Sequence, residues 1–286
     1  MPSNSLIVPD THSANSIFHF VKEQRFLFSA IQHKRLSPRY CKEDIEYLGL
    51  KNQGEVIKSV AILEKCFCDI KLHSIMQPLA VKRINGESFD DCKLSHPEFY
   101  GGFGIAFSKK WAIHHNLQPL HYINAESDEV ESFQKAFEFA TVQDDLDDVL
   151  VDNILYRLCY LKPLSGKMPR REESQLVEYI KNFHDEREWR YIPTLKALKE
   201  VRKERVIFKE LTPMEVDSIN DQLENDEYET IALKFDYSDI VYILVPDYEA
   251  RDNLIREIGK ISGMSSFERE KLISKLLVLC DLEKDS

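Results

Sequence analysis

Hydrophobic residues fall into short groups along the chain, and the spacing within each group predicts its secondary structure. Near the start, residues 17–20 read as a strand, whereas the apolar residues of 26–31 recur at helical spacing. Further apolar runs predict strands at residues 60–70, 101–107, 120–123, 231–235 and 240–245. Helical spacing predicts helices at residues 109–115, 128–161, 174–184, 252–261 and 266–279. This mixture predicts an α+β fold with a mixed, mainly antiparallel sheet at its core and helices around it.

Polar stretches between these groups predict loops. Residues 85–100 are polar throughout, and residues 162–171 contain proline and glycine, so each is expected to form a loop. Pro38 disfavours helix in the residue before it and places Arg39 and Tyr40 in extended chain or a turn. Because no repeat or low-complexity linker divides the chain, we expect one domain at residues 16–286, preceded by a flexible arm at residues 1–15.

Composition narrows the class of protein without naming a function. The chain has 286 residues, of which 43% are hydrophobic and 30% charged, as in a globular protein. No apolar run approaches the roughly 18–20 residues that span a bilayer, and the polar N-terminus does not resemble a signal peptide. We therefore expect a cytoplasmic protein. The six cysteines fit neither a disulfide framework nor a four-ligand zinc site, so no metal is expected.

A net charge of −11 argues against indiscriminate binding to nucleic acid, which needs a basic surface. A local basic groove is still compatible with that charge. The basic residues of the predicted loop at 162–171 are the candidates for holding a single-stranded nucleic acid: Lys162, Lys167, Arg170 and Arg171.

The most unusual stretch is Glu186-Arg-Glu-Trp-Arg190, which alternates charged and aromatic residues and reads as the start of a strand over residues 186–193. Residues two apart share a face of a strand, so Glu186, Glu188 and Arg190 are predicted to point the same way. Adjacent carboxylates repel one another unless cations neutralise them or one of them has a chemical role. The stretch is therefore either a salt-bridged structural strand or a catalytic one.

Other candidates are single residues. His19 lies between two phenylalanines of its strand and projects from the opposite face, toward solvent or a cleft. Arg39 follows a proline turn, where its guanidinium could bind a phosphate or a carboxylate. The chain has no phosphate-binding loop, zinc-protease helix or nucleophile elbow, so the common ATPase, zinc-protease and α/β-hydrolase classes are excluded.

Several sequence words, in this order, resemble the AbiGi-type abortive-infection family of bacterial phage-defence proteins. The words are Ile17-Phe-His-Phe20, Pro38-Arg-Tyr-Cys-Lys-Glu-Asp-Ile-Glu-Tyr-Leu-Gly49, Cys66-Phe-Cys-Asp-Ile70, Gly104-Ile-Ala-Phe-Ser-Lys-Lys-Trp111, Tyr160-Leu-Lys-Pro163 and Asp185-Glu-Arg-Glu-Trp-Arg-Tyr-Ile-Pro193. Members of that family are usually described as antitoxins of a two-gene defence system.

A more distant resemblance is to DarT-like ADP-ribosyltransferases, which carry a histidine on an early strand, an arginine soon after and a glutamate on a late strand. It implies an ADP-ribosyltransferase-like core and NAD as substrate. By that resemblance His19 would hold the NAD ribose or amide, and Arg39 would bind a phosphate or help to activate the acceptor. Glu188, paired with Glu186, would stabilise the sugar cation that develops in the transition state. The remaining cofactor-binding candidates are Tyr40, Phe67 and Phe103.

Two hypotheses follow from these resemblances. The first is a phage-defence toxin that transfers ADP-ribose from NAD to RNA or DNA and is restrained by a cognate antitoxin. The alternative is a non-catalytic AbiGi-type antitoxin or regulator that binds a partner toxin. In that case Glu186 to Arg190 form a structural ion-pair strand, and the acidic run at residues 144–148 contacts a basic partner.

Overall fold

The longest strand, β6 (Ser59–Cys68), organises the main sheet because its two halves pair with different strands. The computed structural model describes residues 14–52, 54–142, 148–172, 175–200, 207–209, 211–223 and 226–284. The main sheet has the order β10-β15-β6-β1-β9-β18-β19, and β3 and β16 pair with the first half of β6. The bounds of its other strands are β1 (Ser16–Val21), β3 (Arg39–Asp44), β9 (Phe103–Ser108), β10 (Gln118–Pro119), β15 (Glu188–Tyr191), β16 (Ile207–Lys209), β18 (Ile240–Val245) and β19 (Leu276–Val278).

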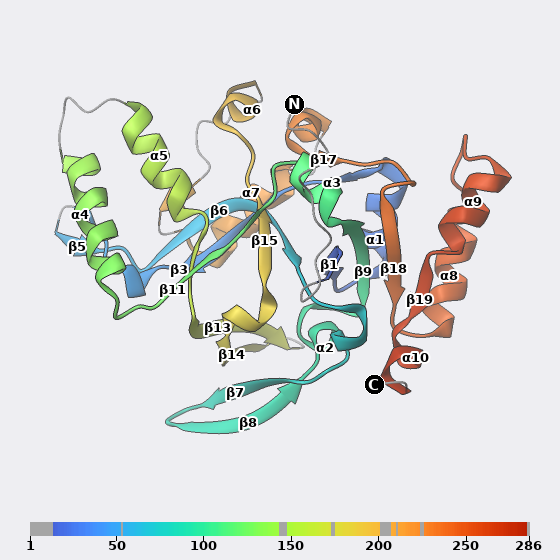
Figure 1. Cartoon of the computed structure of the whole chain (residues 1–286), viewed down its shortest axis with the longest axis horizontal. Helices are drawn as coiled ribbons and strands as arrows, with labels where there is room; N and C mark the ends of the chain where they lie inside the picture. The colour runs from blue at the N-terminus through green and yellow to red at the C-terminus, as the bar shows by residue number, and fades with distance from the viewer. Residues whose placement is uncertain are drawn as a thin grey trace.

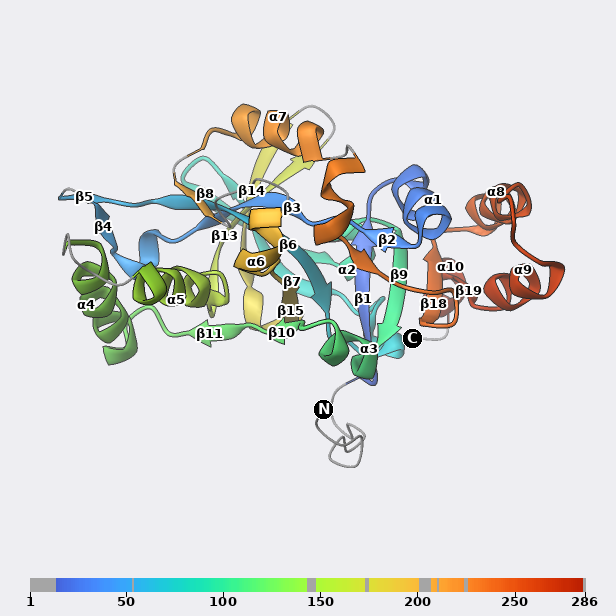
Figure 2. The same ribbon diagram turned by 90° about the horizontal axis from the view of Figure 1, so that it is seen from above.

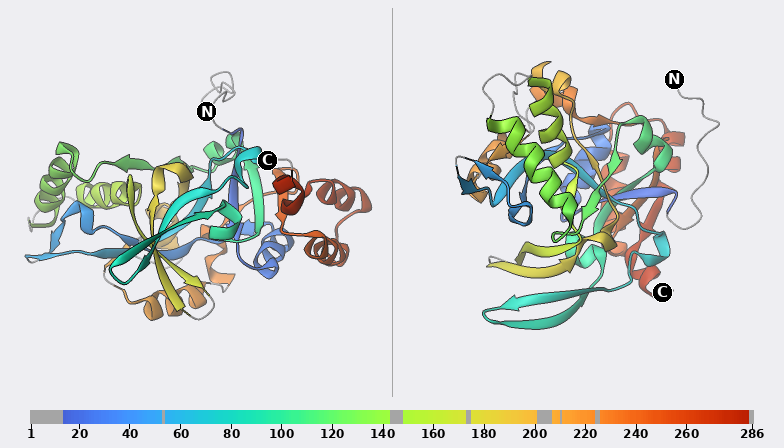
Figure 3. Two further views of the ribbon diagram at one scale, coloured as in Figure 1. Left: turned by 90° about the horizontal axis from the view of Figure 1, so that it is seen from below. Right: turned by 60° about the vertical axis from the view of Figure 1, so that its left-hand side comes forward.

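All neighbours in the main sheet are antiparallel except β18 and β19, which are parallel. A second sheet has the order β13-β14-β7-β8 and projects from the body of the molecule (Figures 1 and 3). Its strands are β7 (Leu79–Asn85), β8 (Ser88–Leu94), β13 (Ser165–Glu172) and β14 (Gln175–Asn182). Three two-stranded sheets join β2 (Arg35–Leu36) to β17 (Leu233–Lys234), β4 (Lys51–Asn52) to β5 (Glu55–Val56), and β11 (His121–Ile123) to β12 (Leu161–Pro163). The predicted α+β fold with a mainly antiparallel mixed sheet is therefore confirmed.

Helices cover both ends of the main sheet (Figures 1 and 2). The α-helices are α1 (Gln24–His33), α2 (His96–Tyr100), α3 (Lys109–His114), α4 (Asp128–Val142), α5 (Asp148–Leu158), α6 (Leu195–Glu200), α7 (Pro213–Leu223), α8 (Tyr248–Gly259), α9 (Ser266–Ile273) and α10 (Leu279–Lys284). The 3-10 helices are η2 (Glu46–Leu48), η3 (Leu72–Ser74), η4 (Phe183–Glu186) and η5 (Asp226–Ile231).

Apolar side chains gather in two large clusters. At one end, Leu27 of α1 and Leu254 of α8 pack against Ile105 of β9 and the neighbouring strands. At the other end, α4, α5, α6 and α7 cover β3 and the first half of β6, as Phe133 of α4 and Leu63 of β6 illustrate. Between these clusters lies the second half of β6, where β15 pairs with it.

Four predicted elements are wrong. The predicted helix at residues 266–279 ends at Ile273, because residues 276–278 pair with β18 as the parallel strand β19 before α10 begins. The predicted helix at residues 174–184 is the strand β14, in which Val177 and Tyr179 alternate inward and pack on α2. The predicted loop at residues 85–100 contains β8 and α2. The predicted basic loop at residues 162–171 consists of β12 and β13.

Residues 1–13 of the predicted arm lie outside the described residues, but its last two residues are bonded to the residues that directly follow β6 and β9. The Ala14 N–H donates to Asp69 Oδ1 at 3.1 Å, and the Lys109 N–H donates to the Asn15 carbonyl at 2.9 Å. The Lys109 ammonium in turn pairs with Asp69 at 2.6 Å.

Candidate functional site: a buried ion network around Glu188

The two glutamates predicted as catalytic reach the same buried region by different routes. Glu188 lies on β15 opposite Cys68 of β6, whereas Glu186 ends the 3-10 helix η4. Between them Arg187 adopts a left-handed backbone conformation, with φ 45°, and the chain turns there. The prediction that the strand begins at Glu186 is therefore wrong. Both carboxylates are nevertheless buried, each residue with 4% of its surface exposed.

One guanidinium, that of Arg190, contacts three carboxylates. Arg190 is fully buried and shares a face of β15 with Glu188, as predicted. Its Nε and Nη2 lie 3.0 and 2.9 Å from Glu188 Oε1, and its Nη1 donates to the Cys159 carbonyl at 2.7 Å. Glu64 Oε2 lies 2.9 Å from Nε, and Glu43 Oε1 lies 3.5 Å from Nη2. Among the described residues Glu64 Oε2 accepts no hydrogen bond, so this carboxyl lies beside the guanidinium without a hydrogen bond to it.

Two lysines from other strands complete the neutralisation. Lys162 of β12 donates to Glu188 Oε2 at 2.8 Å and lies 4.0 Å from Glu186 and 3.9 Å from Glu43. Lys181 of β14 lies 2.6 Å from Glu186 Oε1. Both oxygens of Glu188 are therefore held by cations.

Tyr100 joins the network at its Lys181 end. Its hydroxyl donates a short hydrogen bond to Glu186 and accepts one from the Lys181 ammonium at 2.6 Å. The Lys181 ammonium also lies over the rings of Phe99 and Tyr100, 4.5 Å from each centroid. Burial, followed by the charge of Glu186, raises the pKa of the Tyr100 hydroxyl well above its usual range, so Tyr100 remains a donor.

These charged residues are called the Glu188 network below. Its members are Glu43, Glu64, Lys162, Lys181, Glu186, Glu188 and Arg190. Four carboxylates and three cations leave one unbalanced negative charge. Water reaches the network mainly at Glu43, whose side chain is 19% exposed, while the side chains of Arg190 and Glu64 are almost completely buried.

The surroundings divide the carboxyls into two kinds. Burial raises the pKa of Glu64 to about 8, and Glu43 and Glu188 reinforce the rise against the opposing charge of Arg190. Burial alone would also raise the pKa of Glu188, but Arg190 and Lys162 together outweigh burial and hold that pKa at about 2. The protonated form is therefore favoured at Glu64 and the ionised form at Glu188.

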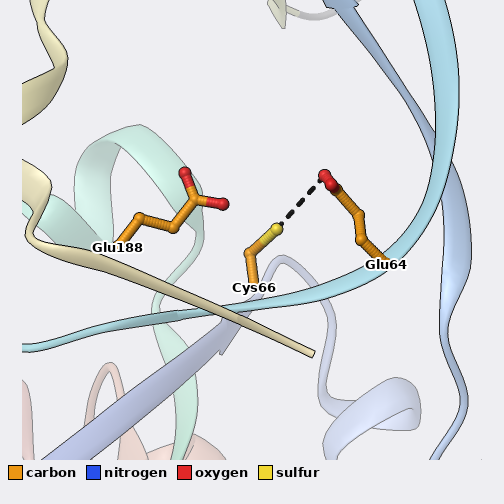
Figure 4. A group of neighbouring side chains, drawn as sticks. All are labelled: Glu64, Cys66 and Glu188. Atoms are coloured by element: carbon orange, nitrogen blue, oxygen red, sulfur yellow. Dashed lines mark hydrogen bonds between the residues drawn. The ribbon is translucent and has the colours of Figure 1, made fainter. Parts of the chain in front are cut away.

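One group of side chains in the network has metal-ligand atoms close together. Ligand atoms of Glu64, Cys66 and Glu188 lie within 4.8 Å of one another, and the two carboxylates point toward each other across the thiol (Figure 4). The Arg190 Nε, however, lies within 3.0 Å of both carboxylates. Burial and the charge of Glu188 also raise the pKa of the Cys66 thiol well above its usual range. A cation here would lie beside a guanidinium and a protonated thiol, so this group does not fit a metal site.

His19 lies on the other face of the main sheet. Phe18 of β1 is opposite Cys68, and Cys68 is opposite Glu188, so Phe18 shares the face of Glu188. The neighbouring His19 projects from the opposite face, where its ring centroid lies 5.5 Å from that of Phe67. Its Nδ1–H donates to the Cys66 carbonyl at 2.9 Å, and burial lowers its pKa to about 3. The structure does not bring His19 and Glu188 into one cleft.

The other predicted cofactor residues are also separated from Glu188. Phe67 and Tyr40 are core residues with 1% and 2% exposure, and Phe103 is a half-buried residue at the start of β9. Arg39 is the exception, because it lies directly opposite Glu64 in the β3–β6 pair.

The predicted nucleic-acid residues do not form one surface. Lys162 is buried in the Glu188 network, with 8% exposure. Lys167 and Arg170 lie on opposite faces of β13, because they are three positions apart, an odd number. Arg170 pairs with Glu172 at 3.0 Å, and its guanidinium lies over the ring of Phe99. The side chain of Arg171 lies outside the described part of the structure.

Sequence reasoning missed Glu43, Glu64 and Lys181. Glu64 alone carried a signal, because it interrupts the apolar run at residues 60–70, and a buried strand rarely contains an unpaired acid. Glu43 and Lys181 lie in ordinary charged surroundings in the sequence and enter the network only through tertiary pairing.

Two comparisons identify the family. Residues 88–246, more than half of the chain, match the model of AbiGi, an abortive phage resistance protein described as an antitoxin. The chain is also 32% identical over 263 residues to the abortive phage resistance protein AbiGi of Lactococcus lactis subsp. cremoris, across 87% of this chain and 98% of that protein. This chain belongs to the AbiGi family. No solved structure matches it.

The segment that matches the AbiGi model contains most of the Glu188 network. Lys162, Lys181, Glu186, Glu188 and Arg190 lie inside it. The network's remaining carboxyls come from β3 and β6, before the matched segment begins. No described helix of this AbiGi protein is long and apolar enough to cross a membrane.

Proposed function

We propose that this AbiGi protein is the antitoxin of a phage-defence toxin–antitoxin pair, a non-catalytic protein that binds and restrains a cognate toxin. The observation that carries the proposal is the state of Glu188. Both of its oxygens are bound by Lys162 and Arg190, and it is almost fully buried. A carboxylate held in this way has the partners of a structural ion network, and both of its oxygens are already occupied where a sugar cation would need one.

Three further features support the antitoxin over the ADP-ribosyltransferase. His19, which would hold NAD in that enzyme, is neutral and bonded on the far face of the sheet. Of the aromatic residues that would stack on nicotinamide, Phe67 is buried in the core. The family description names an antitoxin, which implies a toxin as partner.

The transferase hypothesis stays the alternative, because Glu186 and Glu188 do lie close enough to share Lys162. It requires NAD as substrate and an RNA or DNA acceptor. The contact surface suggested for a basic partner, residues 144–148, lies outside the described residues except for the backbone of Asp148. It stays a prediction.

Growth of a bacterial host tests the two functions against each other. The chain alone should be harmless, the cognate toxin alone should arrest growth, and their co-expression should restore growth. Glu188→Gln and Glu64→Gln form a matched pair, because each neutralises one carboxyl of the same network. Only Glu188 has a role in the transferase hypothesis.

As an antitoxin, the chain should rescue growth equally well with either substitution, provided that circular dichroism shows a folded variant. The opposite result would overturn the proposal: growth arrest by the chain alone that Glu188→Gln relieves and Glu64→Gln does not. Transfer of label from NAD to nucleic acid with the same dependence on Glu188 would establish the transferase.

A further inference from the structure

The projecting sheet has an open edge at β8. Asn85 and Ser88 pair across a two-residue turn in which Gly86 has φ 63°, so they form the hydrogen-bonded pair that closes the hairpin. Hydrogen-bonded and non-hydrogen-bonded pairs alternate along an antiparallel ladder. The backbone N–H and C=O groups of the alternate residues Phe89, Asp91 and Lys93 therefore point away from β7. Within the described residues no other element bonds to them.

The two outer edges of this sheet differ. At the far edge β13 contains Pro169, which lacks a backbone N–H and so hinders pairing with another strand. β8 contains no proline, and it stands away from the body of the molecule (Figure 3). An exposed edge of this kind is a template for an added strand.

The side chains of β8 restrict which strand can be added. Phe89, Asp91 and Lys93 are exposed, and Phe89 has 56% of its surface exposed. Within the described part of the chain, neither Asp91 nor Lys93 has an ion-pair partner. The edge therefore offers one anion and one cation, two residues apart and on one face, where Lys82 of β7 is the cross-strand neighbour of Asp91.

We propose that β8 pairs with β8 of a second copy of this chain, in an antiparallel dimer with twofold symmetry. The two β8 strands can form a hydrogen-bonded ladder only in registers that oppose residues whose backbone N–H and C=O groups point away from β7. A register that opposes Asp91 to Asp91, or Lys93 to Lys93, brings like charges together and is destabilised. The register that opposes Asp91 to Lys93 of the second copy forms two ion pairs, because symmetry repeats each contact.

The same register fixes two more neighbours. Phe89 lies diagonally across from Lys93 of the second copy, within reach of a cation–π contact. Cys92, a free and half-buried thiol, lies directly opposite Cys92 of the second copy. The two four-stranded sheets then become one continuous sheet across the dimer axis.

Sedimentation of the full chain at concentrations up to about 100 μM tests the proposal, because a dimer with a dissociation constant weaker than micromolar is still populated at such concentrations. The wild type should form a reversible dimer of twice the 33.5 kDa chain mass. Asp91→Lys or Lys93→Asp opposes like charges and should weaken dimerisation about ten-fold or more. The double exchange Asp91→Lys with Lys93→Asp should restore it. Lys167→Asp, an exposed lysine at the far edge of the same sheet, is the matched control and should leave the dimer unchanged.

Cross-linking tests the register. Mild oxidation by Cu²⁺, which removes two electrons and releases two protons per disulfide, should link two chains through Cys92. Cys92→Ser should abolish the link. A wild type that stays monomeric, or a dimer that Asp91→Lys leaves intact, would overturn the proposal. If the wild type is monomeric and Asp91→Lys instead blocks binding of the toxin, β8 pairs with the toxin, and the second-copy proposal is wrong. Growth rescue by a monomeric chain would leave the antitoxin proposal standing.

Discussion

Replacing Arg190 by methionine should expose how strongly the Glu188 network depends on one cation. The substitution keeps the volume of the aliphatic stem but removes the guanidinium. Glu188 then keeps only its bond to Lys162, Glu64 loses its nearest positive charge, and the buried Cys159 carbonyl loses its donor. Removing one partner of a buried ion pair costs about 3–5 kcal/mol, because the other charge stays buried without compensation. We therefore expect Arg190→Met to lower the free energy of unfolding by about 3–5 kcal/mol. That is a large part of the total for a domain, which is typically about 5–15 kcal/mol.

Urea unfolding at pH 7, followed by far-ultraviolet circular dichroism and by fluorescence of the two tryptophans, measures the loss. Arg251→Met is the matched control. Arg251 is a partly exposed arginine of α8 that pairs with Asp252 at 2.9 Å, and such surface pairs contribute about 0–1 kcal/mol.

The pH dependence of the loss separates charge from packing. At pH 5 the uncompensated carboxyls around residue 190 take up protons more readily, so Arg190→Met should be less destabilising than at pH 8. Adding Glu64→Gln to Arg190→Met should recover part of the stability at pH 8, because it removes a carboxyl whose ionised form has lost its nearest cation. A loss below about 1 kcal/mol would refute the reasoning. An equal loss at pH 5 and pH 8 would attribute the effect to packing instead of charge.

Three further predictions concern stability. The folded pKa of Glu64, about 8, exceeds the ordinary value of 4.5, so wild-type stability should fall as pH rises from about 4.5 to about 8. Glu64→Gln should abolish this fall. In urea titrations the free energy of unfolding of Glu64→Gln, minus that of the wild type, should therefore increase with pH by at most about 1.4 kcal/mol per pH unit. Gly101→Ala should destabilise the protein by about 3 kcal/mol or more and lower its melting temperature, because φ is 131° and the new Cβ would lie 2.2 Å from the Val21 carbonyl oxygen. Gly259→Ala is the control and should not lower the melting temperature, because open space surrounds that position. Asp247→Ala removes the N-cap of α8, whose carboxylate accepts from Ala250 N–H at 2.8 Å, and should cost about 0.5–2 kcal/mol by urea titration.

Sequence patterns were most reliable where one strand or helix carries its own signal. The strand and helix at residues 17–31 are found as β1 and α1, and the helix predicted at residues 109–115 is α3, whose N-cap Ser108 accepts from Trp111 N–H at 3.2 Å. The apolar runs that became β6, β9 and β18 are also confirmed. These segments are buried in the main sheet, so their apolar pattern follows directly from their environment.

The errors in β14 and β8 lie in the projecting sheet, where only one face is covered. In β14, Val177 and Tyr179 face the small core, but Leu176 remains 66% exposed on the other face. Apolar residues on both faces of a strand imitate helical spacing, and the resulting prediction was a helix. β8 is an edge strand with mostly exposed residues, so no alternation marked it as a strand. Pairing with β7 and β14 decides both structures, and no local pattern contains that information.

The candidate site was predicted in its residue types and not in its geometry. The sequence identified Glu186, Glu188 and Arg190 as a group that needs either neutralisation or a chemical role. The sequence could not decide between neutralisation and a chemical role, because the neutralising cations come from other strands. Lys162, which donates to Glu188, lies 26 residues before it in the chain, and Lys181 lies 7 residues before it. Arg187 also separates the two glutamates, because its backbone is left-handed. Glycine is the usual residue in that conformation, so an arginine there does not predict a turn.

The Glu188 network connects two parts of the molecule whose buried apolar side chains form separate clusters. Glu188 and Arg190 belong to the main sheet, whereas Lys181 belongs to β14 of the projecting sheet and bonds to Glu186 in the turn between them. Buried charges accept few alternative arrangements, because any shift leaves one of them without a partner. The network therefore fixes how the projecting sheet is held against the main sheet. In an antitoxin, this fixed placement would hold the β8 edge of the projecting sheet in one orientation for binding. The paired carboxylates therefore have a structural use that requires no catalysis.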